Sequence, residues 1–210
     1  MPRISDERRE ARREQVLDAA RACLEEHGLE AVSMEMIIDR SGLSTGAVYG
    51  YFKGKEQLIN AVVTEGMAAI AEDLAPVLTD PEPAALPQFV GEVLQAVENF
   101  GRGKGEINRL LVSLHGWSHS QSDPELKKTV GASYTGLRRL FADAVRRGQA
   151  TGTVRRGADP QAVGELLTSI TLGYVAQRAL AGSADVAAHV GALESLLGPP
   201  GAGAPGGAAM

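Results

Sequence analysis

Two short helical segments separated by a three-residue turn constrain the fold of this chain more than any other feature. Ser33 precedes the first segment and Ser44 precedes the second. A serine in front of a helix accepts a hydrogen bond from a free backbone amide of the first turn, so both are expected to be N-caps. In the turn between them, residues 41–43, Gly42 can adopt the positive φ that such a turn requires. The pattern predicts a helix-turn-helix.

The side chains around this turn divide into a packing set and an exposed set. Ile37 and Val48 stand where the two helices must pack together. Small residues begin the second helix and would let it enter a DNA major groove, which is about 12 Å wide. These small residues are Ser44, Thr45, Gly46 and Ala47, and the donors that follow and can reach phosphates are Tyr49, Tyr51, Lys53 and Lys55.

The rest of the chain also has helical periodicity. The first helix is expected over residues 10–27, with a core stripe of Val16, Ala20, Cys23 and Leu24 and a stop at Gly28. After the two short helices, further helices are predicted over residues 55–75, 86–101, 105–119, 124–149, 160–181 and 185–197. Asp123-Pro124 and Asp159-Pro160 are N-cap and proline pairs that mark two of the starts. No β-type alternation extends beyond a few residues, so the fold is predicted to be all-α.

Composition excludes several classes of protein. The chain has 210 residues, of which 44% are hydrophobic, so it can bury a substantial core. Its net charge of −5 argues against a protein that coats nucleic acid, but allows a local DNA-reading face. Cys23 is the single cysteine, so no intrachain disulfide can form. The charged N-terminus is no signal peptide and no apolar run is long enough to span a bilayer, which leads us to expect a cytoplasmic protein that does not use a membrane.

A longer pattern surrounds the turn. Residues 16–62 read VLDAARACLEEHGLEAVSMEMIIDRSGLSTGAVYGYFKGKEQLINAV. The motif elements in chain order are Ala19-Ala20, Gly28, Ser33, Gly42-Leu43-Ser44, Tyr49-Gly50-Tyr51-Phe52 and Lys55-Glu56-Gln57-Leu58. In these elements the segment resembles the N-terminal domain of the tetracycline-repressor-like (TetR) family of bacterial transcriptional regulators. The chain departs from the family pattern at Ile38, where a small residue is usual, and at Cys23-Leu24, where Leu-Phe is common.

The resemblance implies a domain organisation and a function. Residues 1–55 would form a three-helix DNA-binding domain with an N-terminal arm, and residues 56–197 a larger helical domain for ligand binding and dimerisation. The Gly/Pro/Ala-rich tail, residues 198–210, is expected to be disordered from its composition. The implied function is a ligand-responsive repressor that binds a palindromic DNA operator as a homodimer and is released by a small organic molecule. No catalytic residue, metal or cofactor is expected.

The resemblance also implies where the DNA and the second subunit bind. Tyr49, Tyr51 and Lys55 would contact phosphates, while Thr45 and Gly46 would face bases. The full DNA-binding set is Ser33, Ser44, Thr45, Gly46, Ala47, Tyr49, Tyr51, Lys53 and Lys55. Dimerisation would use the last two long helices, through Val163, Leu166, Leu167, Ile170, Leu172, Val175, Val190, Leu193, Leu196 and Leu197, although some of these must face the core of their own subunit.

A ligand pocket is expected inside the helical body. Its apolar and aromatic lining would be Met67, Ile70, Phe89, Phe100, Leu111, Trp117, Tyr134 and Tyr174, and its polar residues Asn108, His115, His119 and Gln177. Such a lining suits an uncharged or weakly polar organic molecule. Core packing without ligand contact is an alternative role for each of these residues.

Other readings stay open from the sequence. His115 and His119 have the spacing of metal ligands on a helix, which favours a helical enzyme or metal-binding protein as an alternative, but no carboxylate or cysteine cluster surrounds them. Gly101, Gly103 and Gly105 are interpreted as a hinge, because no strand precedes them.

The arginines of the N-terminal arm either reach DNA or form a solvated helix end with i,i+4 pairs: Arg3, Arg8, Arg9, Arg12 and Arg13. An activator of the same fold is a further alternative to a repressor.

Overall fold

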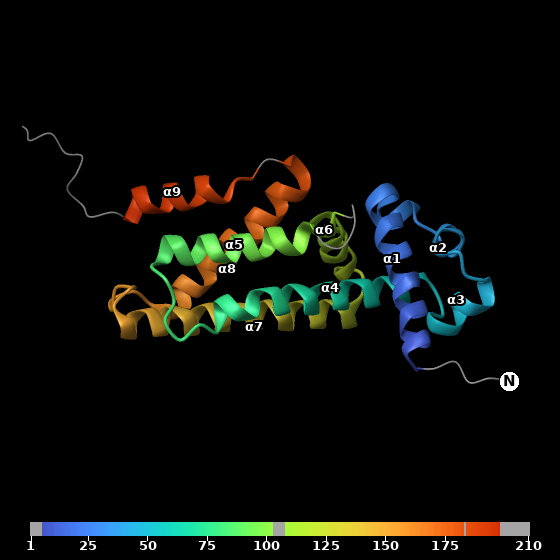
Figure 1. Ribbon diagram of the computed structural model, residues 1–210, viewed down its shortest axis with the longest axis horizontal. Helices are drawn as coiled ribbons and strands as arrows, with labels where there is room; N and C mark the ends of the chain where they lie inside the picture. Colours follow the sequence, from blue (N-terminus) through green and yellow to red (C-terminus); the bar gives the residue numbers. More distant parts are fainter. Residues whose placement is uncertain (1–5, 103–107, 183, 198–210) are drawn as a thin grey trace, which may run out of the picture.

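The computed structural model describes residues 6–102, 108–182 and 184–197, and these form helices without any strand (Figure 1). The helices are α1 (Asp6–Ala31), α2 (Met34–Ser41), α3 (Thr45–Tyr51), α4 (Lys55–Leu78), α5 (Leu86–Arg102), α6 (Arg109–Ser120), α7 (Pro124–Thr151), α8 (Pro160–Ala181) and α9 (Val186–Leu197). The predicted all-α class is confirmed. The predicted disordered tail lies outside the described residues. None of the helices in the described part of the chain is long and apolar enough to cross a membrane.

Side-chain caps begin four of the helices, as the sequence predicts. Ser33 accepts from the Met36 amide at 3.3 Å, and Ser44 accepts from the Ala47 amide at 3.3 Å. The carboxylates of Asp123 and Asp159 cap α7 and α8 in the same way, each directly followed by a proline. Because each cap acts within a few residues of its own position, the sequence alone predicts where these four helices begin.

Two boundaries differ from the expected ones. The first helix begins at Asp6 and continues to Ala31, but Gly28 interrupts it with φ 72° and ψ 173°, so the predicted stop is a kink between two helical stretches. The fourth helix runs past Pro76 to Leu78. Its last carbonyls are held from a distant element, because the Arg147 guanidinium donates to the carbonyls of Leu78 and Asp80. That contact satisfies the Leu78 carbonyl, which the end of the helix leaves without an intrahelical partner.

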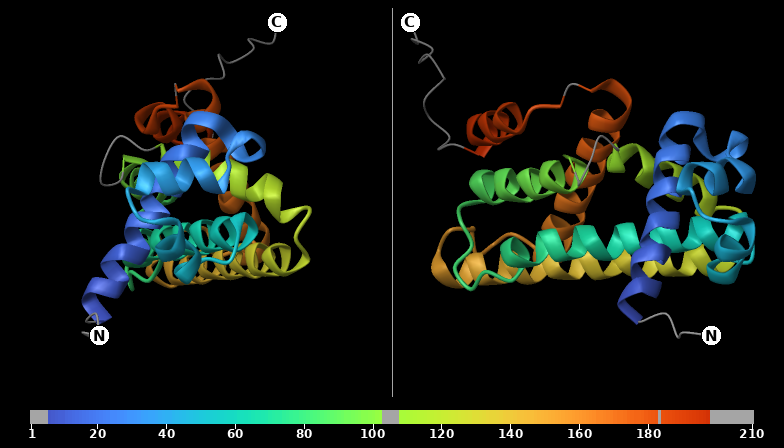
Figure 2. Two further views of the ribbon diagram at one scale, coloured as in Figure 1. Left: turned by 90° about the vertical axis from the view of Figure 1, so that its right-hand side faces the viewer. Right: turned by 45° about the vertical axis from the view of Figure 1, so that its right-hand side comes forward.

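The helices are arranged as a small group at one end of an elongated body. Helices α1, α2 and α3 gather at the right-hand end in Figure 1, and α4 leads from them into the body, where it lies beside α5 and α7 (Figures 1 and 2). Helix α9 packs along α5, and α8 packs against α7. At Gly164 of α8 an added Cβ would stand 2.9 Å from the carbonyl oxygen of Arg138 in α7. Glycine is therefore required there for the close approach of the two helices.

The buried side chains form two clusters. The first contains the fully buried Ile37 and Val48, the buried stripe of α1 with Cys23, and the half-buried Ile38 packed against them. It continues into the first turns of α4 and takes in Val112 of α6 and two residues of α7. The second cluster fills the body between α4, α5, α7 and α8. Since the first core crosses residue 55, the start of α4 is packed as part of the helix-turn-helix unit.

Candidate functional site

The turn between α2 and α3 is held by hydrogen bonds from three sides. Gly42 has φ 66° and ψ 11°, and its amide donates to the carbonyl of Asp39 at 3.2 Å. The Ser41 hydroxyl donates to the Ile38 carbonyl at 2.8 Å and accepts from the Leu43 amide at 3.2 Å. From α1, the Gln15 side chain donates to the Ser41 carbonyl at 2.7 Å. The turn is therefore fixed relative to α1 as well as within itself.

Helix α3 presents small and aromatic residues to solvent. Thr45, Gly46 and Gly50 are exposed, and Tyr49 is 40% exposed, while Val48 on the opposite side is fully buried. An added Cβ at Gly46 or Gly50 would meet no atom within 4 Å. The exposed edge of α3 is thus shallow because its residues are small, and no described residue approaches it at Gly46 or Gly50.

Basic side chains flank this edge. Lys53 is exposed, and its ammonium donates to the carbonyl of Tyr49 at 3.1 Å, at the end of α3. Lys55 is half-buried and its ammonium donates to the carbonyl of Glu30 at 3.4 Å. Each of these contacts uses one of three ammonium donors, which leaves donors for a phosphate. Tyr51, Ala47 and Ser33 are half-buried, and the hydroxyls of Ser33 and Ser44 are engaged as caps.

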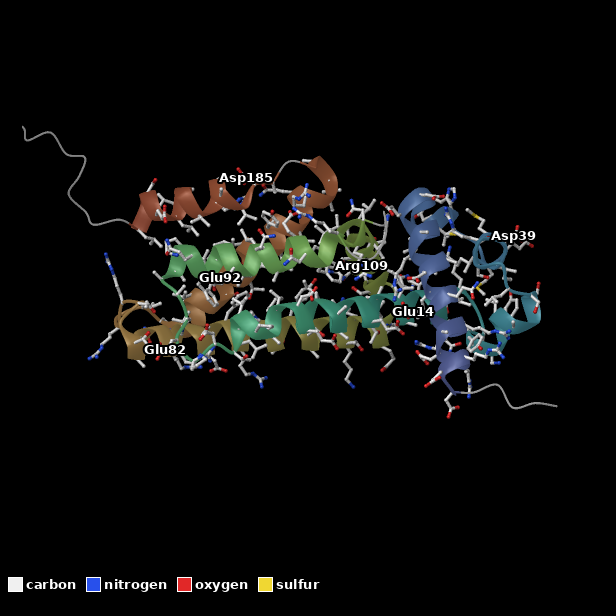
Figure 3. All side chains as sticks on the ribbon, in the orientation of Figure 1. Glu14, Asp39, Glu82, Glu92, Arg109 and Asp185 are labelled. Atoms are coloured by element: carbon white, nitrogen blue, oxygen red, sulfur yellow. The ribbon has the colours of Figure 1, made fainter. Side chains whose placement is uncertain are left out.

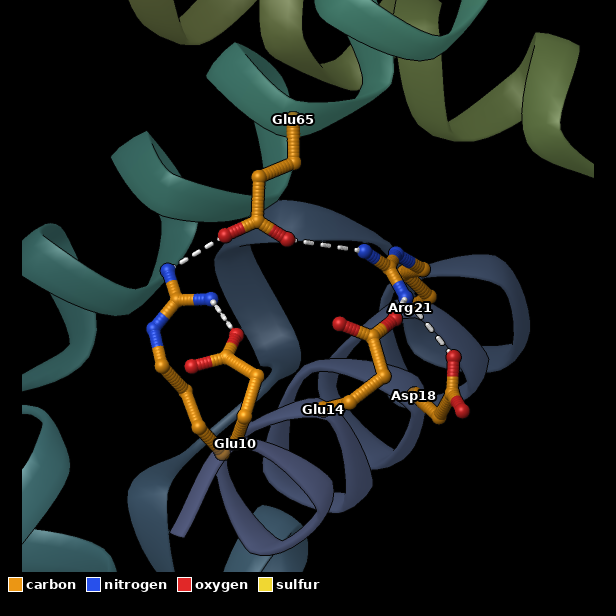
Figure 4. A network of polar contacts seen from close by, with 6 residues as sticks. Glu10, Glu14, Asp18, Arg21 and Glu65 are labelled. Carbon is orange, nitrogen blue, oxygen red and sulfur yellow. Dashed lines mark hydrogen bonds and ion pairs between the residues drawn. The ribbon is translucent and has the colours of Figure 1, made fainter. Parts of the chain in front are cut away.

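A network of ion pairs joins α1 to α4 (Figure 4). Glu65 of α4 bonds to both Arg13 and Arg21 of α1, the latter at 3.2 Å. Arg21 also donates to Glu14 at 2.6 Å and to Asp18 at 2.7 Å. The hydrogen bond with Glu65 raises the pKa of Arg13, whose guanidinium also lies 5.6 Å from the centre of the Phe52 ring. Arg13 is therefore turned toward α4 by its carboxylate partner.

A cavity of about 560 Å³ lies inside the body next to this network. Its walls come from α4, α5, α6, α7 and α8, with Glu14 and Arg21 of α1 at one end. Most of the lining is apolar, with Leu74, Leu78 and Val97 among the buried members. A cavity of this size and character is typical of small-molecule sites.

Five of the expected pocket residues line this cavity: Met67, Ile70, Phe100, Trp117 and Tyr134. Trp117 and Tyr134 contact edge to face with ring centres 6.1 Å apart. Burial raises the pKa of the Tyr134 phenol well above its usual value, so this hydroxyl is a neutral donor and acceptor at neutral pH.

The other seven expected pocket residues lie elsewhere. Two aromatic residues are in the core, because Phe89 packs on Phe141 and the Tyr174 hydroxyl donates to the buried Glu98 at 2.6 Å. Asn108 is the N-cap of α6, and Gln177 is exposed on α8. The remaining three, Leu111, His115 and His119, are on α6 but not in the cavity wall.

The two histidines of α6 lie in different surroundings. An added Cβ at Gly28 would be 3.6 Å from the His115 ring, which places that ring against the kink in α1. The Nε2 atom of His119 is buried without a hydrogen-bond partner in the described part of the structure. Among the described residues, no three histidine, cysteine or acidic side chains gather closely enough to hold a metal ion.

Several cavity residues were not predicted from the sequence. Glu14 and Arg21 reach the cavity from α1, and Glu65, Arg109 and Thr171 line it from α4, α6 and α8. The polar side chains of Ser113 and Ser133 also belong to the wall. Charged residues at helical spacing look like solvated faces in the sequence, and only the packing of α1 on α4 brings some of them to the cavity.

The surface of α8 and α9 carries exposed apolar side chains. Leu166, Leu180, Leu196 and Leu197 are 57%, 75%, 80% and 48% exposed. No residue of the described helix α9 is buried. Of the residues expected in a dimer interface, Leu167 and Val175 are instead buried within the subunit, and the five half-buried ones are Val163, Ile170, Leu172, Val190 and Leu193.

A buried carboxylate of α5 forms an ion pair with the C-terminal end of α8. Glu98 of α5 is 6% exposed and bonds to Tyr174 and Arg178 of α8. Arg178 also donates to the Gly182 carbonyl at 2.8 Å, where the chain leaves α8 toward α9. Burial raises the pKa of Glu98, but the hydrogen bonds from Arg178 and Tyr174 outweigh it and lower that pKa overall. The contact holds the C-terminal end of α8 against α5.

These features define an all-helical DNA-binding regulator of the helix-turn-helix class, with a cavity in its larger part. A family model for the bacterial regulatory proteins of the tetR family matches residues 16–62, and a model for the C-terminal part of BetI-type transcriptional repressors matches residues 92–197. The chain belongs to the tetR family of bacterial regulators, and its C-terminal part is of the BetI type.

Individual relatives agree with this assignment. The BetI transcriptional regulator of Burkholderia lata is 30% identical over 158 residues, which cover 71% of this chain and 77% of that protein. The transcriptional repressor Rv1474c of Mycobacterium tuberculosis is 38% identical over 85 residues, but the match spans 38% of this chain and only 46% of the repressor's length. Among solved structures, SmeT, the repressor of the Stenotrophomonas maltophilia multidrug efflux pump SmeDEF, superposes with a TM-score of 0.65 at 25% identity. That match covers 93% of this chain and 94% of SmeT.

Proposed function

We propose that the chain is a homodimeric transcriptional repressor that binds a palindromic DNA operator and leaves it when a small organic molecule occupies the cavity. The observation that carries this proposal is that one helix, α4, forms part of the core of the helix-turn-helix at its start and a wall of the cavity further along. Names of relatives support the direction of regulation, because Rv1474c and SmeT are both repressors. The proposal includes no catalytic step and places the protein in the cytoplasm with the DNA.

DNA binding would use the exposed edge of α3. Thr45 and Gly46 would face base edges in the major groove, which the open space in front of Gly46 permits. Phosphates would be contacted by Tyr49, Tyr51, Lys53 and Lys55, and by Ser33 and Ser44 at the helix starts, since phosphate contacts fix the register of a recognition helix. Ala47 would stand beside the bases at the edge of the contact.

Dimerisation would use the exposed face of α8 and α9. A single recognition helix of seven residues reads too few bases for useful specificity, whereas two copies on a two-fold axis read a palindrome. The exposed leucines, with the half-buried Val163, Ile170, Val190 and Leu193 beside them, form a surface that a second copy would cover. Helical pairs of this kind form four-helix interfaces.

Release would pass through the ion-pair network between α1 and α4. Glu14, Arg21 and Glu65 belong both to the cavity wall and to this network. In a second conformation these contacts would be rearranged, and α1 and the helix-turn-helix would have another orientation relative to α4. A ligand that binds this conformation more tightly shifts the population toward it. Two subunits displaced in this way no longer match half-sites one or more helical turns apart.

The test is selection of bound duplexes from a random DNA pool with the purified full chain. The proposal predicts enrichment of one palindromic sequence, and protection of both half-sites when the enriched duplex is footprinted. A Thr45→Ala variant taken through the same selection should enrich a different sequence, while Glu72→Ala, an exposed change on α4, should enrich the same one. Recovery of unenriched DNA by the wild type would refute the proposed function.

A further inference from the structure

The cavity wall contains an arginine that has no acidic partner. Arg109 is the first residue of α6 and is half-buried at the wall. Its guanidinium lies 5.7 Å from the centre of the Phe100 ring, which lines the same cavity. Figure 3 shows Arg109 where the start of α6 meets the end of α5, and Glu14 on α1. Stacking on an aromatic ring holds the plane of a guanidinium and leaves its N–H edge available.

The other charged groups of the cavity are all engaged in ion pairs. Glu14 and Glu65 both bond to Arg21, and Glu65 also bonds to Arg13. Within the part of the chain that the structure describes, Arg109 contacts the Phe100 ring and no carboxylate pairs with it. Among the charged residues of the described cavity wall, Arg109 is therefore the one without an ion-pair partner. A partly buried cation without a counter-ion is costly, so the site favours an anion.

The remainder of the wall limits the size and kind of this anion. Beyond Arg109 the lining is mainly aliphatic, with Leu74, Leu78, Leu137 and Leu140 on α4 and α7. The polar groups there, the Tyr134 and Thr171 hydroxyls and the Trp117 indole, are neutral. A single guanidinium matches the charge of one carboxylate, whereas a phosphate ester or a tricarboxylate would carry further charge without a partner. The carboxylates of Glu14 and Glu65 are already bonded to Arg21 and Arg13.

We propose that the effector is a monocarboxylate with an apolar body, its carboxylate paired to Arg109 and its body packed among the leucines of α4 and α7. This rests on the proposed function and narrows the class of its ligand. It differs from the uncharged or weakly polar molecule that the sequence suggests, because Arg109 lies in the cavity wall. An arginine binds a carboxylate through two parallel N–H donors, so the pairing selects both charge and planar shape.

The test measures head-group preference on one apolar body. Decanoate, decan-1-ol and decyltrimethylammonium are titrated into the full-length chain at neutral pH, with binding followed by calorimetry and by the emission of Trp117, the single tryptophan. The proposal predicts that decanoate binds at least ~10-fold more tightly than the alcohol, the size expected for hydrogen bonds to a charged group. The ammonium compound should bind most weakly. Naphthalene-2-carboxylate and 2-naphthol repeat the comparison on a rigid body.

Variants locate the preference. Arg109→Gln should abolish the difference between decanoate and decanol by weakening decanoate binding, and Arg109→Lys should keep part of the difference. Arg139→Gln, at an exposed arginine of α7 outside the cavity wall, is the matched control and should retain the full preference. Three results would each overturn the proposal. They are carboxylates that bind no more tightly than the matching alcohols on both apolar bodies, no binding of any of the ligands, and a preference for the carboxylate that survives Arg109→Gln.

Failure of this inference is distinguishable from failure of the proposed function. Ligand binding is measured without DNA, and operator binding is measured without ligand. A chain that selects a palindrome but prefers decanol refutes only the carboxylate class. Selection of no sequence refutes the repressor, even when decanoate binds as predicted.

Discussion

Glu65 of α4 accepts a hydrogen bond from Arg21 of α1 at 3.2 Å, and its other carboxylate oxygen bonds to Arg13, which lies a little over two turns earlier in α1. One carboxylate thus clamps two positions of α1 to α4 (Figure 4). Since Glu65 and Arg21 also line the cavity, the contact connects the cavity wall to the helix that supports the turn.

Replacing this carboxylate should loosen the connection. Glu65→Gln is expected to lower the free energy of unfolding by only about 1 kcal/mol, because the pairs are partly exposed, yet to weaken operator binding several-fold. The measurements are chemical denaturation and operator affinity. Glu72→Gln, at an exposed position of the same helix, should change neither. Unchanged operator affinity for Glu65→Gln would show that α1 does not depend on this clamp.

The buried Glu98 predicts how stability depends on pH. Its pKa in the folded chain is lowered, so its ionised form contributes stability that is present above the ordinary carboxyl value of 4.5 and lost as pH falls through the folded pKa. Glu98→Gln should therefore have a lower free energy of unfolding than the wild type at neutral pH. On acidification its free energy of unfolding should fall by less than that of the wild type. Denaturant titrations at a series of pH values test this, with Glu92→Gln, exposed on the same helix, as control. An identical acid profile for Glu98→Gln and wild type would contradict it.

A cavity-filling substitution separates ligand response from DNA binding. Gly136 of α7 lies in the cavity wall, and an added Cβ there would meet nothing within 4 Å. Gly136→Leu should fill the cavity at no cost in stability, because glycine inside a helix is unfavourable by about 1 kcal/mol relative to good helix formers. The variant should bind operator normally but fail to bind an apolar fluorescent dye that the wild type binds. Gly131→Leu, exposed on the same helix, should bind the dye like the wild type.

The exposed leucines of α8 and α9 predict assembly. Leu166→Glu should convert the dimer to a monomer, since it places a charge on an apolar surface that the second copy would cover. Sedimentation at micromolar concentration measures this. Leu140→Glu, at a leucine of α7 that is 41% exposed, should stay dimeric. Dissociation by both substitutions, or by neither, would argue against this interface. A charge at Leu167, buried in its own subunit, would instead disturb folding.

The parts that the sequence predicted are those governed by local chemistry. Ser33, Ser44 and Gly42 act within a few residues of their own position, so the caps and the turn followed from residue type alone. The buried stripe of α1 followed from helical spacing, including Cys23.

The cavity was predicted only in part, because its lining depends on contacts between distant segments. Tyr174 was expected to face a ligand, but it is bonded to Glu98, 76 residues earlier. The sequence does not single out Arg109, because its neighbours along the chain do not distinguish an arginine in a cavity wall from one on the surface. Its stacking on Phe100 and its place in the wall follow from how α5 and α6 meet.

Salt-titrated binding to the selected operator and to a scrambled duplex tests the central claim most directly. The account predicts that the wild type prefers the operator and that log affinity falls linearly with log salt. Lys55→Ala should weaken binding to both duplexes and reduce the slope of log affinity against log salt by about 1. Thr45→Ala should reduce the preference for the operator over the scrambled duplex and leave that slope unchanged. A wild type that binds operator and scrambled duplex equally at every salt concentration would contradict the account of α3 as a sequence-reading helix.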